Sequence, residues 1–552
     1  MTKAFDSRAI DRRLLIKAGT FGLAALATPG AALAFTMGRG FTHGVASGEP
    51  DHHSVLLWTR YAADHDVDLT AEIAEDEAFE RVIARASTVA SPARDHIAKI
   101  VLGELSPGQW YFYRFVAPDG SFSDTGRTRT LPQGSLDAFN IAVFSCSNLP
   151  FGWFNAYAHA SARSDIDLVM HLGDYLYEYP AGSYPDTRDI VEGRILAPQN
   201  ELVTLADYRL RYAAYRSDPD LRRLHQLYPM IAMWDDHEFA NDAWSGGAQN
   251  HQSDSEGDWE MRKRVAEQAY REWLPVSDRS MAQPRWSAYQ IGNLATVIKT
   301  ESRIGGRDEP AELAAALAGK ADLGAAIRTF RDDIWQDPNR QMLGSDQEAW
   351  LAEQFRQSRS SGTIWQLWAQ QCVMGSLRVP EDSASWVPAD SPDYVVRRAQ
   401  AGAAASRAGL PFNMDAWDGY PVARNRALTM AQQAEANLVV LSGDSHNGWA
   451  FDLDANGAAA GVEFAGQSVT SPGLEGYVRT KAADEVAAAL VATNPQLRWT
   501  DTSHRGYLTV QLTPERATAS WHKLRTIRER DTALAGSATQ SVAAGRNQLA
   551  AD

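Results

Sequence analysis

The chain has few cysteines and few basic residues for its size. Cys146 and Cys372 are its only cysteines, so it can build neither a disulfide framework nor a cysteine-based zinc cluster, and one bridge is the maximum. Lys and Arg total 53 against 69 Asp and Glu, a formal charge of -16, and such a surface repels nucleic acid. With 44% hydrophobic and 22% charged residues over 552 positions, the chain is not a disordered protein. Its length predicts two to four domains.

Several familiar signatures are missing as well. The sequence has no Gly-x-Ser-x-Gly elbow, no Gly-x-x-x-x-Gly-Lys phosphate-binding loop and no His-Glu-x-x-His motif. The stretch from Asp452 to Glu463 matches the calcium-loop pattern of an EF-hand. An EF-hand needs a helix on each side, whereas the flanking residues here alternate as strands do. We therefore interpret Asn456-Gly457 as a hairpin turn.

Long apolar runs are absent except at the N-terminus. Arg12 and Arg13 precede an apolar run from Ala18 to Ala34, which ends in a small-x-small pattern that a signal peptidase cuts. We predict that residues 1–34 are a twin-arginine signal peptide, and the alternative is an anchor left in place. The prediction implies export by the twin-arginine machinery, a periplasmic or secreted location and no stable membrane anchor after cleavage.

The rest of the chain divides by composition. Aromatic and β-branched runs separated by turns predict a small N-terminal β-sandwich, immunoglobulin-like or fibronectin-like, over residues 41–131. Over residues 138–532, short apolar runs alternate with helical stretches, which predicts an α/β layered catalytic domain. Within it, residues 380–420 lack clear periodicity and are expected to form a long surface loop or lid. Residues 533–552 are small and polar and are expected to be a disordered tail.

Polar residues follow four of the apolar runs directly. In open α/β sheets, sites form at the carboxyl ends of the strands, so we expect these side chains to meet in one crevice. Each is weak evidence by itself, because a Gly-Asp after a strand is more often a turn and a lone His is more often structural. Their joint placement favours a functional site. The candidates are Cys146, Asp174, Tyr177, Asp235, Asp236, His237, Asp444 and His446.

The mixture of side chains points to cations. Several carboxylates in one crevice repel each other unless cations neutralise them. Thiolate, phenolate and imidazole suit a transition metal, while carboxylates suit a hard ion such as calcium. A site offering both kinds could hold a mixed pair about 3.5–4 Å apart, bridged by one carboxylate, which is the two-metal arrangement for phosphoryl transfer.

Three motifs resemble those of the PhoD-type alkaline phosphatases, a branch of the metallophosphoesterases. They are Gly173-Asp174 with Tyr177, the run Trp234 to Glu238, and Gly443-Asp444 with His446. The resemblance extends from Phe41 to Gly473 and so spans nearly the whole mature chain. The family also has a twin-arginine signal and a small N-terminal β-domain, so the resemblance implies the same architecture here.

The resemblance implies an iron(III) ion and calcium as cofactors. By motif, Asp174 would bridge the metals and His237 would be the proton donor to the leaving alkoxide. Asp235 is either a ligand or a group that supports one. Where many relatives have Asp-Thr-Arg, this chain has Glu301-Ser302-Arg303, so the role of Glu301 stays open; His504 is expected to be structural. The iron ligands would be Cys146, Asp174, Tyr177 and His446, and the calcium ligands would include Asp236 and Asp444.

The favoured function is an exported phosphatase that hydrolyses phosphate mono- and diesters by attack of a metal-activated hydroxide. One alternative is a phospholipase-type phosphodiesterase, which an apolar groove in residues 380–420, around Trp386 and Val395, would favour. Another is a non-catalytic metal-binding exported protein with an adhesion module. A disulfide between the two cysteines is disfavoured, because Cys146 lies at the level of the other candidates whereas Cys372 lies within an apolar run and is expected in the core.

Overall fold

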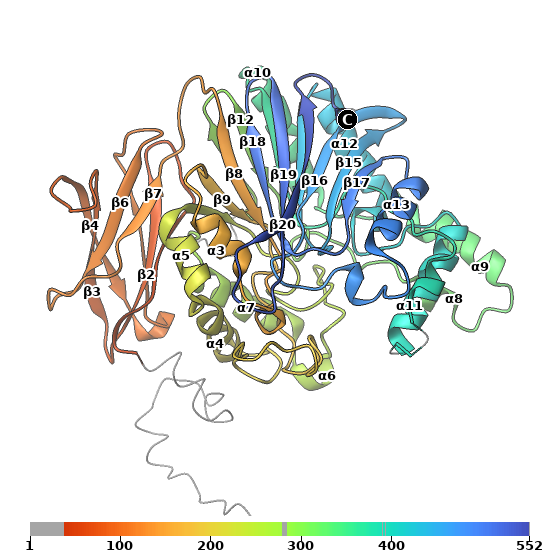
Figure 1. The fold of residues 1–552 in the computed structure, drawn as a ribbon, viewed down its shortest axis with the longest axis horizontal. Coiled ribbons are helices and arrows are strands. Elements are labelled where there is room, and N and C mark those ends of the chain that lie inside the picture. The colour runs from red at the N-terminus through yellow and green to blue at the C-terminus, as the bar shows by residue number, and fades with distance from the viewer. Residues whose placement is uncertain (1–37, 279–283, 389, 392, 551–552) are drawn as a thin grey trace, which may run out of the picture.

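The computed structural model describes residues 38–278, 284–388, 390–391 and 393–550 (Figure 1). The predicted signal peptide, residues 1–34, lies outside this part of the chain. Among the described residues, no helix combines the length and the apolar character needed to cross a membrane.

Three β-sheets organise the described chain. A nine-stranded sheet has the order β20-β19-β18-β8-β9-β10-β1-β2-β5, a seven-stranded sheet has the order β11-β12-β13-β14-β16-β15-β17, and a four-stranded sheet has the order β4-β3-β6-β7. The strands are β1 (Gly40–Gly48), β2 (Val55–Ala62), β3 (Val67–Ala74), β4 (Val82–Ala90), β5 (Ile97–Leu102), β6 (Trp110–Val116), β7 (Gly126–Arg129), β8 (Phe139–Phe144), β9 (Leu168–His171), β10 (Pro229–Ala232), β11 (Ser287–Ile291), β12 (Ala295–Lys299), β13 (Trp365–Ala369), β14 (Leu438–Ser442), β15 (Gly448–Ala455), β16 (Ala458–Ala465), β17 (Leu497–Asp501), β18 (Gly506–Leu512), β19 (Arg516–Leu524) and β20 (Leu534–Ala543).

The two larger sheets pack face to face between outer layers of helices. Their facing side chains, among them Val143, Met170 and Leu441, form one buried cluster. Helices α3, α4, α5 and α7 pack on the outer face of the nine-stranded sheet, and α10, α12 and α13 pack on that of the seven-stranded sheet. The result is the α/β layered fold that the alternating pattern predicts. The α-helices are α3 (Asn155–Ser161), α4 (Leu205–Arg216), α5 (Pro219–Leu227), α6 (Ser253–Glu256), α7 (Trp259–Trp273), α8 (Leu313–Leu317), α9 (Leu323–Thr329), α10 (Ser345–Ser360), α11 (Asp393–Arg407), α12 (Pro421–Gln433) and α13 (Ala483–Thr493).

The N-terminal region forms the predicted β-sandwich, at the left of Figure 1. The four-stranded sheet packs against β1, β2 and β5 through a core that includes Leu57, Tyr113 and Phe115. The second sheet of this sandwich is not separate, however, because β1 pairs in parallel with β10 and so continues the nine-stranded sheet. The opposite face of β2, with Trp58, packs into the helical layer of the catalytic region. The sandwich is therefore an extension of the catalytic core.

The strands that precede the candidate residues are parallel neighbours. In the nine-stranded sheet, β8 pairs in parallel with β9, and β9 with β10; in the seven-stranded sheet, β14 pairs in parallel with β13 and β16. Parallel strands end at the same edge of a sheet, so the loops after β8, β9, β10 and β14 are brought to one side of the core. The hairpin prediction is also confirmed: β15 and β16 pair through a turn at Asn456 and Gly457, both with positive φ.

Two segments differ from the sequence-based expectation. The predicted tail, residues 533–552, contains β20, which pairs along the whole of β19, and Leu549 beyond it is buried. Most residues of β20 are small, so the composition of this segment gave no signal of a strand. The expected loop over residues 380–420 contains the helix α11. Alanine has the highest helix propensity but carries no apolar periodicity, so this Ala-rich stretch gave no helical signal.

Removing residues 534–552 tests the role of this last strand. The deletion exposes the edge of β19 and removes the buried side chains of Val542 and Leu549, whose burial contributes about 3–6 kcal/mol together. We expect a clear fall in the midpoint of urea unfolding, relative to a control that lacks only residues 551–552. An unchanged midpoint would show that the tail is dispensable, as its composition suggests.

Candidate metal centre

Four candidate residues have a backbone conformation that side chains seldom adopt. Cys146, Asp174, Asp444 and His446 have φ values of 59°, 53°, 61° and 64°. A left-handed conformation at a residue other than glycine costs about 1–3 kcal/mol, and such residues cluster at functional sites. Each of the four follows the end of a core strand by two to four residues. The strain thus turns the side chains into the space beyond the strand ends.

Close approach of the loops depends on two glycines. A Cβ atom on Gly173 would lie 2.4 Å from the Cβ of Asp235, and one on Gly443 would lie 2.7 Å from the Cβ of Ser145. Real Cβ contacts are never so short, so each position requires glycine. Gly173 brings the loop after β9 against the loop after β10, and Gly443 brings the loop after β14 against that after β8.

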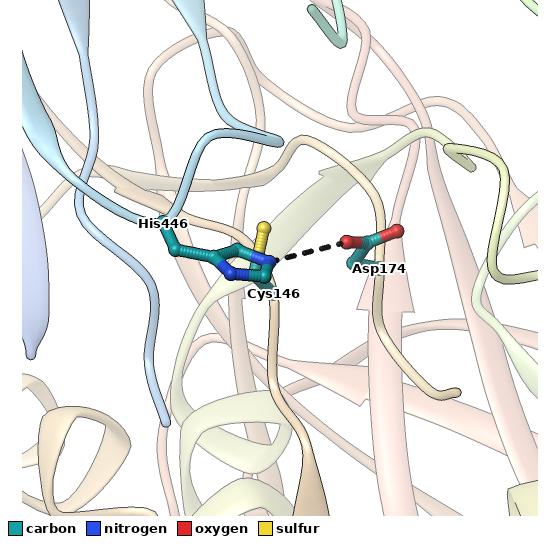
Figure 2. A group of neighbouring side chains, drawn as sticks. All are labelled: Cys146, Asp174 and His446. Carbon is teal, nitrogen blue, oxygen red and sulfur yellow. Dashed lines mark ion pairs between the residues drawn. The ribbon is translucent and has the colours of Figure 1, made fainter. Parts of the chain in front are cut away.

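One group of side chains combines sulfur, nitrogen and oxygen. The thiol of Cys146, a carboxylate oxygen of Asp174 and a ring nitrogen of His446 lie within 4.8 Å of one another. Figure 2 shows the imidazole of His446 facing the carboxylate of Asp174, with His446 Nε2 4.0 Å from Asp174 Oδ2. The hydroxyl of Tyr177 donates to Asp174 Oδ2 at 3.0 Å and lies 3.2 Å from His446 Nε2. All four residues that the sequence placed around one metal are therefore adjacent.

The orientation of His446 suits metal binding. Its Nδ1–H donates to the carbonyl oxygen of Pro472 at 2.8 Å, so the lone pair of Nε2 faces Asp174 and Tyr177. A backbone partner of this kind fixes the tautomer of metal-binding histidines. Burial lowers the pKa of His446 to about 3, which keeps the ring neutral and available as a ligand. Ser471 donates to the Tyr177 hydroxyl at 2.6 Å and fixes that side chain in turn.

A second group offers oxygen atoms alone. Carboxylate oxygens of Asp235, Asp236 and Asp444 lie within 4.8 Å of one another, and Asp236 also groups with Asp174 and His237. Among the described residues, three buried carboxylate oxygens here make no hydrogen bond: Oδ1 of Asp174, Oδ2 of Asp235 and Oδ1 of Asp236. Of the three, Asp236 Oδ1 lies 3.6 Å from the Arg303 guanidinium. Buried carboxylate oxygens without hydrogen bonds are costly, and a divalent cation is the partner that such a set fits.

Arg303 places a positive charge among the carboxylates of the site. Its buried guanidinium bonds to Asp235 Oδ1, donates to Asp415 Oδ2 at 2.5 Å and lies 3.3 Å from Asp444 Oδ1. At Asp236 the charges of Arg303 and His237 outweigh burial and lower the pKa, but these two side chains do not balance all the carboxylates of the two adjoining groups. Burial raises the pKa of Asp174 well above its ordinary value; His237 opposes this shift and the neighbouring carboxylates add to it. Burial likewise raises the pKa of Asp444 to about 7. A bound cation would reverse both shifts, so the donor set fits metal ions.

Glu238 holds two of the loops together. Its buried carboxylate accepts from the backbone N–H groups of Asp174 at 3.1 Å, Tyr175 at 2.6 Å and Asp235 at 2.7 Å. These donors come from the loops after β9 and β10. The glutamate of the Trp234 to Glu238 motif therefore positions Asp174 and Asp235 without facing the candidate metals itself.

His237 is held by a carboxylate that the sequence did not indicate. Its Nδ1 lies 2.6 Å from Glu178 Oε2, while Glu178 Oε1 accepts from Asn241 and Asn250. Burial by itself lowers the pKa of His237, but the carboxylates of Asp236 and Glu178 outweigh it and raise the pKa well above the ordinary value. These carboxylates favour the protonated imidazole, which could donate a proton from the nitrogen that Glu178 does not hold.

Other residues singled out in the sequence have supporting places. Glu301 accepts from the indole of Trp234 and from the backbone N–H of Arg303, at 3.1 and 2.7 Å, so it fixes the arginine and binds no metal candidate directly. His504 pairs with Asp501. Cys146 and Cys372 are both free thiols. Cys372 is buried in the core, as expected, but at the edge of the site, since its sulfur groups with Asp415 and Asp444.

Comparison with known proteins identifies the family of this chain. The model of the family described as PhoD-like phosphatase matches residues 141–521, and that of its N-terminal domain matches residues 29–132. The chain is 31% identical over 515 residues to alkaline phosphatase D of Bacillus subtilis (strain 168), covering 90% of this chain and 79% of the relative. The solved structure described as "Structure of PhoD" superposes with a TM-score of 0.75 at 29% identity, covering 93% of this chain and 92% of that one.

The layered fold, the site beyond the ends of the core strands and the similarity to these relatives together define a phosphoric ester hydrolase. The chain belongs to the PhoD-like phosphatase family.

Replacing Glu238 by Gln tests its positioning role. The amide offers one acceptor oxygen and one NH₂ group where three N–H groups now point, so at least one backbone donor loses its partner. Such a loss costs about 1–3 kcal/mol, and it displaces the loop that carries Asp174. We expect lower stability in urea and a large fall in phosphatase activity. Glu353→Gln on α10, where the carboxylate is exposed, is the matched control. Equal behaviour of the two variants would refute the role.

Proposed function

We propose that this phosphatase is an exported, metal-dependent hydrolase of phosphate mono- and diesters. The observation that carries the proposal is the pair of adjoining donor groups, one with thiol, phenol and imidazole and one with carboxylates alone, with three buried carboxylate oxygens that make no hydrogen bond. The first group has the ligands of a ferric ion and the second those of calcium.

Asp174 is our candidate for the bridging ligand, because it lies with Cys146 and His446 in the first donor group and also lies within reach of Asp236, a member of the carboxylate group. Cys146, Tyr177 and His446 complete the iron site, and Asp236 and Asp444 serve calcium. Asp235 is a supporting residue in this proposal, since one of its oxygens is already bonded to Arg303. When bound, the two cations supply charge for the phosphate oxygens and lower the pKa of a coordinated water.

His237 is our candidate for the acid that protonates the leaving alkoxide. Its ring lies in the donor group with Asp174 and Asp236, next to the metal candidates. Glu178 fixes the ring through Nδ1 and helps to keep it protonated. A positioned acid of this kind contributes most when the leaving alcohol has a high pKa, because its alkoxide is a poor leaving group.

Export by the twin-arginine route rests on the sequence alone. Arg12 and Arg13 precede an apolar run that ends in a signal-peptidase pattern. A folded, metal-loaded precursor suits that route, because it carries folded proteins. The proposed location is the periplasm or the exterior.

Support for the phospholipase alternative is weaker in this structure. Within residues 380–420, the side chains of Trp386 and Val395 are buried, and the ammonium of Lys481 lies over the Trp386 ring. These apolar residues therefore form no exposed groove for a lipid. A purely metal-binding role is also disfavoured, since both His237 and Asp174 are present in the site.

Asp174→Asn tests the metal assignment. The amide has the same shape but cannot bridge two cations as a carboxylate does, so we expect turnover of p-nitrophenyl phosphate to fall to background. The far-ultraviolet circular dichroism spectrum should stay that of the unaltered protein. Asp165→Asn, at an exposed carboxylate that pairs with Arg163, is the control. A well-folded Asp174→Asn variant with normal turnover would contradict the assignment.

His237→Gln tests the proton donor through the leaving group. Hydrolysis of an alkyl phosphate needs protonation of the alkoxide, whereas p-nitrophenolate leaves unaided. We expect kcat for the alkyl ester to fall by about 10²–10⁴-fold and kcat for the p-nitrophenyl ester to fall much less. Glu178→Gln should show the same pattern more weakly. An equal loss on both esters would assign His237 to metal or substrate binding instead.

The export proposal is tested by replacing Arg12 and Arg13 together with lysine. The charge is kept but the arginine pair that the machinery reads is lost, so the precursor should accumulate inside the cell. Fractionation and immunoblotting measure its distribution. Normal export of the double variant would indicate the general secretory route.

A further inference from the structure

Aromatic rings adjoin the candidate proton donor. The ring centre of Tyr179 lies 5.3 Å from that of His237 and 5.7 Å from that of Tyr184. Tyr184 lies 5.7 Å from Tyr177 and 4.9 Å from Phe151, again between ring centres. Tyr179 and Tyr184 are partly exposed, so their rings offer aromatic surface beside the residue that we propose as the acid for the leaving alkoxide.

A cavity of about 250 Å³ adjoins Tyr184. It is formed mainly by residues 181–199, which follow Tyr179 in the chain, and apolar atoms make up most of its wall. Ile195, a large apolar side chain in this wall, is 48% exposed. The cavity therefore presents accessible apolar surface next to one of the aromatic rings. Its apolar lining residues are Pro150, Tyr184, Ile190, Val191, Ile195 and Leu196.

Hydrogen bonds hold the cavity in a fixed position relative to the metal centre. Arg211 joins the two ends of the loop, because its guanidinium donates to the carbonyl oxygens of Tyr179 at 3.3 Å and of Pro198 at 2.9 Å. Asn148, in the loop after β8, donates from Nδ2 to the carbonyl oxygen of Tyr184 at 3.3 Å. The loop that lines the cavity is thus tied to a loop that carries a candidate iron ligand.

The charged residues of the lining do not select an anion. The charge of the buried Arg194 is balanced by Asp218, at 2.5 Å, and its Nε donates to the carbonyl oxygen of Leu149 at 3.1 Å. The exposed Glu192 adds a negative charge. An apolar group is therefore the occupant that this lining fits. An apolar cavity of about 150 Å³ holds benzene, so this one can take a single ring or a short branched chain, but not the two acyl chains of a phospholipid.

We propose that Tyr179, Tyr184 and this cavity bind the leaving alcohol of the substrate, and that the preferred substrates are phosphate esters of small apolar alcohols. The inference rests on the proposed function, because it takes the position of the leaving alcohol from His237. With the phosphate at the metal centre, the leaving oxygen lies on the side of His237, and the two tyrosine rings lead from there to the cavity. Apolar surface that the alcohol buries against them stabilises the bound ester and its transition state.

The preference for an apolar alcohol can be measured on the unaltered enzyme. Benzyl phosphate and 2-methoxyethyl phosphate have leaving alcohols of similar acidity, so they need similar help from the acid, but only the first carries a ring. We expect kcat/KM, measured by phosphate release, to be about tenfold higher for benzyl phosphate. Equal values would overturn this inference and leave the proposed function standing, whereas hydrolysis of neither ester would overturn both.

Ile195→Asn tests the cavity itself. Asparagine is polar but uncharged and suits an exposed position, so the variant should fold. We expect the preference for benzyl phosphate to fall towards equality while kcat/KM for 2-methoxyethyl phosphate stays unchanged. Ile83→Asn, at a similarly exposed isoleucine on β4, is the matched control and should keep the preference. An unchanged preference in Ile195→Asn, or an equal loss on both esters, would overturn the inference.

Crystals of the unaltered protein soaked with benzylphosphonate give a readout that does not depend on turnover, because this compound has no ester bond to hydrolyse. We expect the phosphonate at the metal centre and its ring against Tyr179, Tyr184 and Ile195. A ring that points into solvent, or that lies against another wall of the site, would overturn the inference.

Discussion

Concentrated negative charge at the ends of the core strands is the constraint on which the rest of this structure depends. Asp174 and Asp236 are buried and Asp444 is partly buried beside them, and Arg303 is the only guanidinium bonded to the group among the described residues. Burial raises the pKa of Asp174 and Asp444, whereas at Asp236 the charges of Arg303 and His237 outweigh burial and lower the pKa. Cations are the partners that keep them ionised. The same cations offset the charge of a phosphate ester, so the arrangement that is costly without metals is the one that hydrolysis requires.

The fold holds the candidate ligands in place against that repulsion by fixing the loops that carry them. Strained left-handed residues set the direction of the side chains, and Glu238 joins the loops after β9 and β10 through three backbone N–H groups. Arg505 donates to the carbonyl groups of His446 and Ser471, which secures the loop after β14. Catalysis of phosphoryl transfer consists mainly of positioning and electrostatic stabilisation. A rigid frame around a charged centre is therefore the protein's main contribution.

The sequence predicted more of the site than of the frame around it. Apolar runs followed directly by polar or ionisable residues predicted the layered fold. The parallel pairing of the corresponding strands explains why eight side chains from distant parts of the sequence meet. The supporting partners were beyond sequence reasoning, because their contacts join distant segments: Asp415 lies 112 residues from Arg303 in the chain. Glu178 follows Tyr177 directly, yet nothing local shows that it faces His237. The predictions from composition were wrong where small residues form regular structure, as in β20 and α11.

We propose that the two donor groups, which differ in chemistry, hold two different metals. Elemental analysis of the purified protein, combined with its visible absorption spectrum, tests this most directly. The account predicts both iron and calcium, and a charge-transfer band from thiolate and phenolate ligands. Cys146→Ser should lose the iron and the colour but keep calcium, whereas Cys372→Ser should keep all three. A colourless active enzyme without iron, or an unchanged spectrum in Cys146→Ser, would contradict the account.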